Sequence, residues 1–472
     1  MNDAALLSRL TAAAGEDALI ADPARIAPML QDHRALFRGQ ALAVLAPADT
    51  AAVSRILAFC HEHRIGVVPQ GGNTSYCGGA TPDASGSQVV LSTARLNRVR
   101  AVDAANHTLT AEAGCILADL QTVASEADRY LPLSLGSEGS CMLGGNLSTN
   151  AGGLNVIRYG MARELVLGLE VVLPDGSVLD TLTGLRKDNT GYDIRSLFLG
   201  AEGTLGVITA ACLKLYPALR AHATAFAAVR DPDAAVALLG ALRAASGDCV
   251  TSFELIPRIG VELTTRHIPG VVDPLARPSA WYVLVELSSA RAAEPLGSIL
   301  EEALGQALES GWISDAAISQ NESERAAFWR LRESIPEAQR RDGASLKHDI
   351  SVPVSQVPRF IEAAGAWVTQ HVPQGVLVAY GHLGDGNLHF NINQRAGTAA
   401  AELQADEPRV KRAIHDFVRD FGGSFSAEHG IGQLKVLELE RYAQPVELEL
   451  MRRVKQAFDP RGIMNPGKVL RS

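Results

Sequence analysis

The sequence predicts an α+β protein built from more than one domain. Its 472 residues exceed what a single hydrophobic core accommodates, so two or three domains are expected. Apolar runs of strand length alternate with helical patterns in both halves of the chain, and the pattern changes after Pro217. Beyond Pro217, strands separated by helices are typical of an antiparallel sheet with helices on one face.

The N-terminal residues, 1–37, predict a helical segment. They alternate apolar and charged residues and lack a basic stretch followed by an apolar one, so we expect a helix and not a signal peptide. Residues 41–47 and 65–70 are apolar runs that predict strands, and 49–63 between them has apolar residues at helical spacing. A loop rich in Gly, Ser, Thr and Asn follows directly at 71–79.

The rest of the first half continues with short elements. Asp175-Gly176 lies between two apolar runs, which is a β-hairpin signal. The other elements expected here are strands at 89–99 and 107–114, a helix at 116–127 and a strand that ends near Pro217.

The second half has longer elements. A charged helix at 322–341 is expected to be interrupted or to end near Pro336, because proline disrupts a helix interior. Alternation over 346–353 predicts one strand with Lys347, Asp349 and Ser351 on one face. The other elements are strands at 221–229, 249–257 and 281–289, helices at 231–246 and 293–310, and a C-terminal helix with a Pro/Gly-rich extension within 447–470. The domain prediction is an N-terminal segment 1–37, domains 38–217 and 218–420, and a C-terminal segment 421–472.

Composition and charge narrow the class of protein. The net charge of −9 and pI of about 5.8 argue against nucleic acid or an anionic membrane as the main partner. The six cysteines form no CxxC pair, which indicates reduced thiols. No stretch is long and apolar enough to span a bilayer, so we expect a soluble cytoplasmic protein.

Three loops combine glycine with small polar residues, at 69–75, 136–153 and 200–206. Glycine lets a backbone approach a ligand closely, and successive N–H groups bind phosphate oxygens. One such loop usually marks a turn, but three in one half of the chain favour a shared diphosphate ligand. There is no GxxxxGK[ST] motif, and 200–206 has GxxGxxG spacing instead of GxGxxG, so a P-loop and direct NAD binding are not expected.

Five motifs carry a specific resemblance. In order, they are PQGGNTSYCGGA, GSCMLGGNLSTNAGGLNVIRYG, LRKDNTGYDIRSLFLGAEGTLGVIT, GHLGDGNLHFN and SAEHGIG. From about residue 38 to 470 the chain resembles the FAD-dependent D-2-hydroxyacid dehydrogenases of the vanillyl-alcohol-oxidase-like flavoproteins, and most closely their D-2-hydroxyglutarate dehydrogenase branch. This resemblance implies a two-part FAD-binding domain of the p-cresol methylhydroxylase type, an α+β substrate domain, and a C-terminal segment that carries the catalytic loop and returns to the FAD domain.

The resemblance also implies an FAD site. No histidine lies in the 71–75 loop for covalent attachment, so non-covalent FAD is expected. The implied FAD-binding residues are Gly71, Gly72, Asn73, Thr74, Ser75, Ser140, Gly145, Asn146, Thr149, Asn150, Gly153, Glu202, Gly203, Val207, Ile208 and Asn465.

Two histidines flank the turn in YGHLGDGNLHFN. An ordinary hairpin is one interpretation, but His382 at the end of one strand and His389 at the start of the next can converge. Glu428 would add a carboxylate and complete a set suited to zinc or manganese, which could chelate a 2-hydroxycarboxylate. His429, beside Glu428, is then the expected general base, although it could be a structural loop histidine.

Substrate contacts are expected from Arg332, Lys347, Asn391 and His429. Arg332 and Lys347 match the family's carboxylate contacts, although a solvated helix face and a strand salt bridge are the alternatives. Pro336 departs from the hydroxyglutarate pattern, which has a threonine there. If both cations face a distal carboxylate, a monocarboxylate leaves buried charge unpaired, which predicts a hundredfold or larger preference for a dicarboxylate.

The expected reaction is oxidation of a D-2-hydroxyacid, foremost D-2-hydroxyglutarate, to the 2-oxoacid by hydride transfer to FAD. The electrons would leave to a carrier such as electron-transfer flavoprotein or a quinone. A D-lactate or glycolate dehydrogenase, or a flavin-binding subunit without its own turnover, are the alternatives. A homodimer is one arrangement that the sequence allows.

Overall fold

The computed structural model describes residues 3–471, which fold into two compact units. Of the described residues, unit 1 comprises 3–153, Gly160–Ala218 and 428–471, and unit 2 comprises Leu154–Tyr159 and Leu219–Ala427. The predicted division placed the boundaries at 217/218 and 420/421. Both units combine helices and sheets, as the α+β prediction requires.

The first part of unit 1 is a small parallel sheet of order β1-β3-β2. Its helix α3 (Thr50–His63) begins where the Asp49 carboxylate accepts a hydrogen bond from the Ala52 N–H at 2.7 Å, and ends at Arg64 in a left-handed conformation. Apolar side chains of α1, α3 and the sheet form one core. The elements are α1 (Asp3–Ala14), η1 (Glu16–Ala18), α2 (Pro23–Ile26), η2 (Ala27–Leu30), β1 (Ala43–Leu45), β2 (Val67–Gln70) and β3 (Val89–Ser92).

The second part of unit 1 is an antiparallel sheet of order β4-β5-β9-β7-β8. The hairpin predicted at Asp175-Gly176 is confirmed, since β7 and β8 pair in antiparallel fashion around it. The strands are β4 (Val99–Asp103), β5 (Thr108–Glu112), β7 (Val166–Val172), β8 (Val178–Asp180) and β9 (Val207–Lys214), with a separate pair β6 (Arg129–Tyr130) and β10 (Tyr216–Pro217). The helices are α4 (Leu117–Glu126), α5 (Leu143–Ser148), α7 (Ala162–Leu165) and α8 (Arg195–Phe198).

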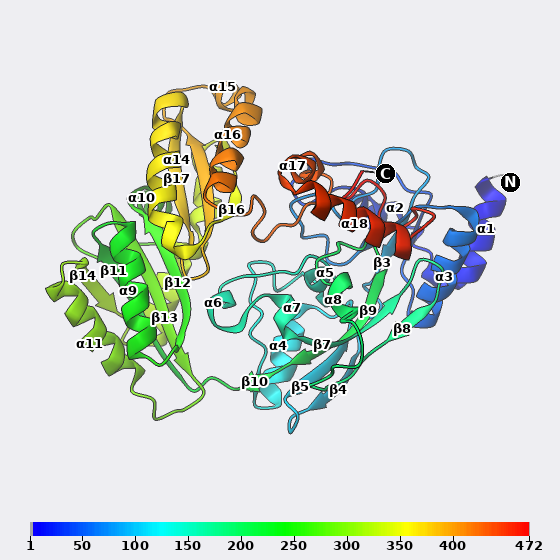
Figure 1. Cartoon of the computed structure of the whole chain (residues 1–472), viewed down its shortest axis with the longest axis horizontal. Helices are drawn as coiled ribbons and strands as arrows, with labels where there is room; N and C mark the ends of the chain where they lie inside the picture. The colour runs from blue at the N-terminus through cyan, green and yellow to red at the C-terminus, as the bar shows by residue number, and fades with distance from the viewer. Residues whose placement is uncertain (1–2, 472) are drawn as a thin grey trace. The chain divides into compact units, whose positions relative to one another are not determined.

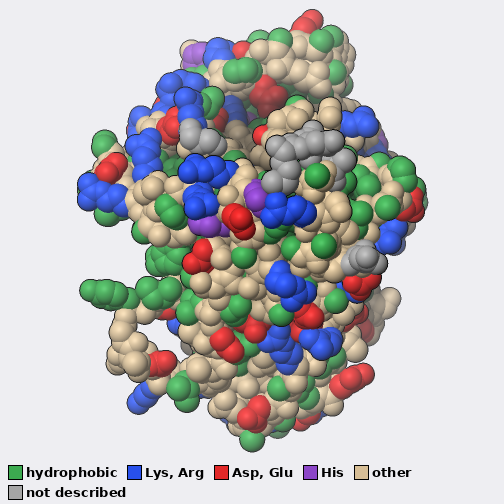
Figure 2. Space-filling model, turned by 90° about the vertical axis from the view of Figure 1, so that its right-hand side faces the viewer, with side chains coloured by type: hydrophobic (Ala, Val, Ile, Leu, Met, Phe, Trp, Pro, Cys, Tyr) green, Lys and Arg blue, Asp and Glu red, His purple; other side chains and the backbone are tan. Residues whose placement is uncertain are grey.

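The C-terminal segment completes unit 1. It contains α17 (Val436–Tyr442) and α18 (Pro445–Phe458), then runs beside β2, where Met464 forms a parallel bridge with Val67. No helix among residues 3–471 combines the length and apolar character needed to cross a membrane. Acidic and basic side chains are interspersed on the face that Figure 2 shows.

Unit 2 is built on an eight-stranded antiparallel sheet of order β14-β11-β13-β12-β17-β18-β15, with β16 also paired to β18. The strands are β11 (Ala221–Val229), β12 (Val250–Pro257), β13 (Trp281–Ser289), β14 (Ile313–Ile318), β15 (Ser345–Leu346), β16 (Asp349–Ser351), β17 (Gly375–His382) and β18 (Asn387–Gln394). The helices are α6 (Val156–Tyr159), α9 (Pro232–Ala245), α10 (Arg258–His267), α11 (Leu296–Glu309), α12 (Glu322–Glu333), α13 (Ile335–Asp342), η3 (Val354–Gln356), α14 (Val357–His371), α15 (Ala400–Ala405) and α16 (Glu407–Asp420).

Helices cover both faces of this sheet, so the prediction of helices on one face was wrong. Figure 1 shows α9, α11 and α14 along one face, where their apolar side chains form a single core with the sheet. Side chains of α10, α12 and α13 form a second core with the opposite face. The physical reason lies in β12 and β13, which are buried at nearly every position and therefore have two apolar faces to cover.

Two local predictions near the site can be compared with the structure. The helix expected to be interrupted near Pro336 is α12 followed by α13, with Pro336 in the first turn of α13, where its missing N–H costs no hydrogen bond. The single strand expected over 346–353 was wrong. Between β15 and β16 the His348 N–H bonds to the Asn391 side chain instead of to a strand, which breaks the alternation.

Candidate active site

The loop after β2 lies against the second Gly-rich segment within unit 1. Gly72 approaches Ser140 so closely that a Cβ at residue 72 would lie 2.2 Å from the Ser140 carbonyl oxygen. Gly71, Gly72, Asn73 and Ser140, all predicted FAD residues, line a cavity of about 770 Å³. Its size is in the range of ligand sites, and a Cβ added at nearby Gly145 would meet open space.

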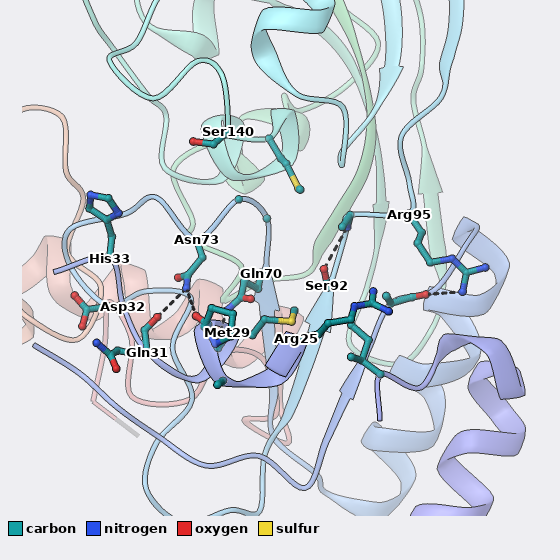
Figure 3. Close-up of a pocket in the computed structure, with 18 of the residues that line it drawn as sticks. Arg25, Met29, Gln31, Asp32, His33, Gln70, Asn73, Ser92, Arg95 and Ser140 are labelled. Atoms are coloured by element: carbon teal, nitrogen blue, oxygen red, sulfur yellow. Dashed lines mark hydrogen bonds between the residues drawn. The ribbon is translucent and has the colours of Figure 1, made fainter. Parts of the chain in front are cut away.

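Asn73 holds the N-terminal segment over this cavity. It has a left-handed backbone (φ 53°), and its side-chain amide donates to the carbonyls of Pro28 (3.1 Å) and Gln31 (2.8 Å), the second drawn in Figure 3. Arg25 and Arg38 line the same cavity and bring positive charge suited to phosphate. These N-terminal residues were not predicted, because nothing in their spacing indicates which loop they meet.

The remaining predicted FAD residues also lie in unit 1 but do not line this cavity. Gly145, Asn146 and Thr149 belong to α5 or its C-terminal cap, and Val207 and Ile208 open β9. Thr74 and Ser75 follow Asn73, while Asn150, Gly153 and Gly203 occupy loops; Asn150 and Gly203 have left-handed backbones, and a Cβ at Gly153 would meet the Ser134 carbonyl oxygen.

Asn465, a predicted FAD residue, lies against the loops that contain Gly79 and Glu202. Its N–H donates to the Val67 carbonyl at 2.8 Å, and its side-chain amide donates to the carbonyls of Gly79 and Glu202. Its Oδ1 is buried without a hydrogen-bond partner. A buried acceptor of this kind suits a ligand N–H, so the residues present fit a dinucleotide cofactor.

Glu202 has a second role that its position in the chain did not indicate. Its buried carboxylate accepts hydrogen bonds from the N–H groups of Ile431 (2.7 Å) and Gly432 (2.8 Å). Burial raises the pKa of Glu202, and those two N–H groups oppose the rise. Glu202 thereby fixes the loop that contains the candidate base.

His429 lies in that loop, within unit 1. Its ring packs edge-on against the ring of Tyr76, with ring centroids 4.8 Å apart. Tyr76 is three residues beyond Asn73 of the predicted pyrophosphate loop. The backbone carbonyl of Cys77 accepts a hydrogen bond from the Gln433 N–H at 2.9 Å. The candidate base is therefore attached to the same unit as the predicted flavin loops.

The histidine pair lies in unit 2. His382 ends β17 and His389 lies in β18, with ring centroids 5.7 Å apart and ring nitrogens within 4.8 Å of each other. The turn between them uses Gly386 with φ 83°, where a Cβ would meet the Val352 carbonyl oxygen at 2.1 Å. Two imidazoles that converge in this way can hold a divalent metal.

Glu428 follows unit 2 along the chain. Ser424 bridges to Ser351 of β16, and the Ala427 N–H lies 3.4 Å from the carbonyl of Asp349, which pairs with His389 across β16 and β18. Glu428 is the next residue, and successive Cα atoms are about 3.8 Å apart. The role of Glu428 as a metal ligand stays a prediction from the sequence.

A buried carboxylate that was not among the predicted site residues adjoins His382. Glu254 Oε1 lies 2.5 Å from His382 Nδ1, and its Oε2 accepts a hydrogen bond from Arg332 Nε at 2.6 Å. Burial acts to raise the pKa of Glu254, but the charges of Arg332 and His382 outweigh it and hold this pKa down to about 2. The signal in the sequence was an acid within the apolar strand VTSFELIP.

The predicted substrate residues of unit 2 differ in exposure. Arg332 lies in the last turn of α12, is 5% exposed and has its Cζ 5.0 Å from the Tyr380 ring centroid. Lys347 is exposed between β15 and β16. Asn391 is buried, with its amide donating to Gln339 at 3.0 Å and accepting from the His348 N–H at 3.2 Å. Because Glu254 pairs with Arg332, a monocarboxylate would not leave that guanidinium unpaired, contrary to the sequence-based argument.

Solved structures similar to this one share its fold. An alkyldihydroxyacetonephosphate synthase matches with a TM-score of 0.75 at 18% identity, covering 98% of this chain and 84% of its own. p-Cresol methylhydroxylase matches with a TM-score of 0.76 at 16% identity, and the match covers 99% of this chain and 97% of that protein's chain. The prediction of a two-part FAD-binding domain of the p-cresol methylhydroxylase type with an α+β partner is confirmed.

Sequence comparisons agree. Residues 41–182 match the family described as FAD binding domain, and 218–469 match FAD linked oxidases, C-terminal domain. A Bos taurus protein named D-2-hydroxyglutarate dehydrogenase, mitochondrial, is 40% identical and covers 96% of this chain and 81% of its own. A Xanthomonas citri protein named D-2-hydroxyglutarate dehydrogenase is 36% identical, and the match covers 91% of this chain and 89% of that protein. With both domains matched and full-length relatives this similar, the chain belongs to the FAD-linked D-2-hydroxyacid dehydrogenases.

Proposed function

We propose that this protein oxidises D-2-hydroxyglutarate to 2-oxoglutarate, using non-covalent FAD and a divalent metal, zinc or manganese, held by His382, His389 and Glu428. The names of the relatives support the substrate, since several that are similar over most of their length are named D-2-hydroxyglutarate dehydrogenase and another is named a D-2-hydroxyglutarate–pyruvate transhydrogenase. The electrons leave to an acceptor such as electron-transfer flavoprotein or a quinone.

One observation within unit 2 carries the choice of a dicarboxylate. Glu254 contacts both His382 and Arg332, so a candidate metal ligand and a candidate carboxylate receptor are separated by a single side chain. A substrate that places its 2-hydroxycarboxylate at the histidines can extend a second carboxylate toward the guanidinium. Arg332 offers a planar fork for that group, and exposed Lys347 adds a second positive charge.

The bound groups supply a hydride acceptor, which is FAD, and a Lewis acid for the substrate hydroxyl, which is the metal. The protein orients the substrate through Arg332, Lys347 and Asn391. His429 would remove the proton from the hydroxyl oxygen while the carbon that bears this hydroxyl gives up its hydride to the acceptor, so that the O–H and C–H bonds break and the C=O bond of the 2-oxoacid forms. Glu202 limits the movement of the His429 loop through its two backbone hydrogen bonds.

A shorter diacid such as D-malate is the second candidate. Pro336, in the first turn of α13, has no hydroxyl to donate to a distal carboxylate. A chain lacking that contact discriminates less by the length of the diacid.

Dye-linked turnover of the purified protein with D-2-hydroxyglutarate, D-malate, D-lactate and glycolate tests this function. Because Arg332 already has a partner, the gain from a distal carboxylate is that of a charged hydrogen bond, about 1.5–3 kcal/mol. We expect kcat/KM for D-2-hydroxyglutarate to exceed that for D-lactate roughly ten- to hundredfold. Equal values would contradict the substrate, and no turnover with any acid would favour a flavin-binding subunit.

Lys347→Met sharpens the assay because Lys347 is exposed and its removal leaves the core intact. The variant should lose efficiency with D-2-hydroxyglutarate and retain it with D-lactate. Lys411→Met, a lysine of α16 in the same unit, is the matched control and should change neither. Equal losses for both substrates would mean that Lys347 does not contact the distal carboxylate.

A further inference from the structure

Glu254 is an acid in the centre of an apolar sheet. It lies on β12, whose eight residues are all buried, and its own exposure is 0%. Burial of a carboxylate away from water is costly unless the group is paired and hydrogen-bonded. A strand of this kind therefore has a specific reason to contain it.

The sheet register places Glu254 at His382. The two residues are opposite each other in the antiparallel pairing of β12 with β17. One carboxylate oxygen meets His382 Nδ1 at 2.5 Å, and the other accepts from Arg332 Nε at 2.6 Å. Both contacts are buried, since Arg332 is 5% and His382 8% exposed.

This arrangement fixes which ring nitrogen of His382 carries the hydrogen. A carboxylate oxygen accepts, so Nδ1 donates, and in the neutral ring that a metal requires the lone pair then lies on Nε2. A metal-ligating histidine typically donates its other N–H to a carboxylate in this way, which holds the ring and raises its basicity. Arg332 can only donate, so it occupies the other oxygen and keeps the carboxylate from rotating.

We propose that Glu254 is a positioning residue that couples the metal site to recognition of the substrate's distal carboxylate, by orienting His382 with one oxygen and Arg332 with the other. This inference rests on the proposed function. It predicts that one substitution weakens both metal binding and selectivity for a dicarboxylate.

Glu254→Gln removes the coupling with almost no change in size. Arg332 needs an acceptor, so the amide oxygen turns to it and the NH₂ group faces His382. The NH₂ group then donates to Nδ1, which moves the ring hydrogen to Nε2 and blocks the lone pair that a metal needs. The opposite amide rotamer restores His382 but places two donors, NH₂ and Nε, against each other.

The same sheet provides a matched control. Glu286 on β13 is also buried, and its carboxylate accepts from Arg325 at 2.7 and 2.9 Å and from Trp329 Nε1 at 2.8 Å. It contacts none of the three predicted metal ligands. Glu286→Gln therefore reports the effect of losing a buried, arginine-paired carboxylate that does not touch the predicted metal ligands.

The experiment measures zinc affinity by competition with a chelating dye, using FAD-loaded protein stripped of metal. Zinc affinity should fall roughly ten- to hundredfold in Glu254→Gln and stay within about threefold of wild type in Glu286→Gln. At saturating zinc, the ratio of kcat/KM for D-2-hydroxyglutarate to that for D-lactate should fall in Glu254→Gln only. Unchanged zinc affinity in Glu254→Gln, with wild type binding zinc, would overturn the inference.

A second measurement separates this inference from the metal itself. In metal-free protein labelled with ¹⁵N-histidine, the His382 signal, identified by its loss in His382→Gln, should show hydrogen on Nδ1 in wild type. That signature should move to Nε2 in Glu254→Gln. If wild type binds no zinc, the metal part of the proposed function fails, and the inference fails with it unless this signature is found. Hydrogen on Nε2 with none on Nδ1 in wild type overturns the inference even if Glu254→Gln does not fold.

Discussion

Gly72→Ala tests the close contact between the predicted pyrophosphate loop and the second Gly-rich segment. The added Cβ would lie 2.2 Å from the Ser140 carbonyl oxygen and 3.0 Å from the Cys141 Cα. Non-bonded heavy atoms prefer about 3.5 Å, so the two segments must separate by roughly 1 Å. Because the obstruction is backbone, no side-chain rotation relieves it.

The expected cost follows from that displacement. Inserting a methyl group into a packed contact costs about 1–3 kcal/mol. The cavity lined by both segments would deform by the same movement, so FAD affinity should fall roughly 5- to 150-fold. Gly71→Ala is the matched control, because its Cβ would meet Met142 Cβ at 3.4 Å and Gly145 at 3.6 Å, which are ordinary contacts.

Fluorescence titration of flavin-free protein with FAD measures both variants. Gly72→Ala should bind FAD more weakly than wild type, and Gly71→Ala within a few-fold of it. Equal affinity in the two variants would refute the argument that the Gly72–Ser140 contact shapes the FAD site. A weaker Gly71→Ala alone would indicate that the ligand occupies the space above residue 71.

The remaining predictions concern the metal, the base and a core thiol. Chelation should abolish turnover while FAD stays bound, with recovery on addition of zinc or manganese; full activity of metal-free protein would contradict the metal proposal. His429→Ala should retain both FAD and metal but lower kcat by roughly two to four orders of magnitude, and a smaller loss in stopped-flow flavin reduction would mean another base. Burial raises the pKa of the Cys60 thiol from 9.0 to about 12. The thiol therefore loses its proton at lower pH in the unfolded chain than in the folded one. The stability that Cys60 contributes is fully present below pH 9 and is lost as pH rises towards 12. In urea unfolding, the free energy of unfolding of wild type should fall about 1 kcal/mol more than that of Cys60→Ala between pH 8 and 10. Equal falls in the two proteins would contradict the raised pKa of Cys60.

Local features of the chain could be predicted because they depend on residues close in sequence. The hairpin at Asp175-Gly176 and the helix break at Pro336 follow from the dihedral preferences of glycine and proline. The convergence of His382 and His389 follows from a short turn between antiparallel strands. The Gly-rich loops indicated a phosphate ligand for the same reason, since their conformational freedom is a property of each residue.

Contacts between distant residues were decided only by the tertiary structure. Glu254 meets His382 across 128 positions and Arg332 across 78, and Glu202 meets Ile431 across 229. Asn73 reaches back to Pro28 and Gln31 in the same way. Sheet order and the packing of α12 on the unit 2 sheet set the two Glu254 pairs, loop packing within unit 1 sets the others, and neither is encoded in local periodicity. An acid in an apolar strand indicates that a partner must exist, because a buried charge needs one, but only packing selects which side chain provides it.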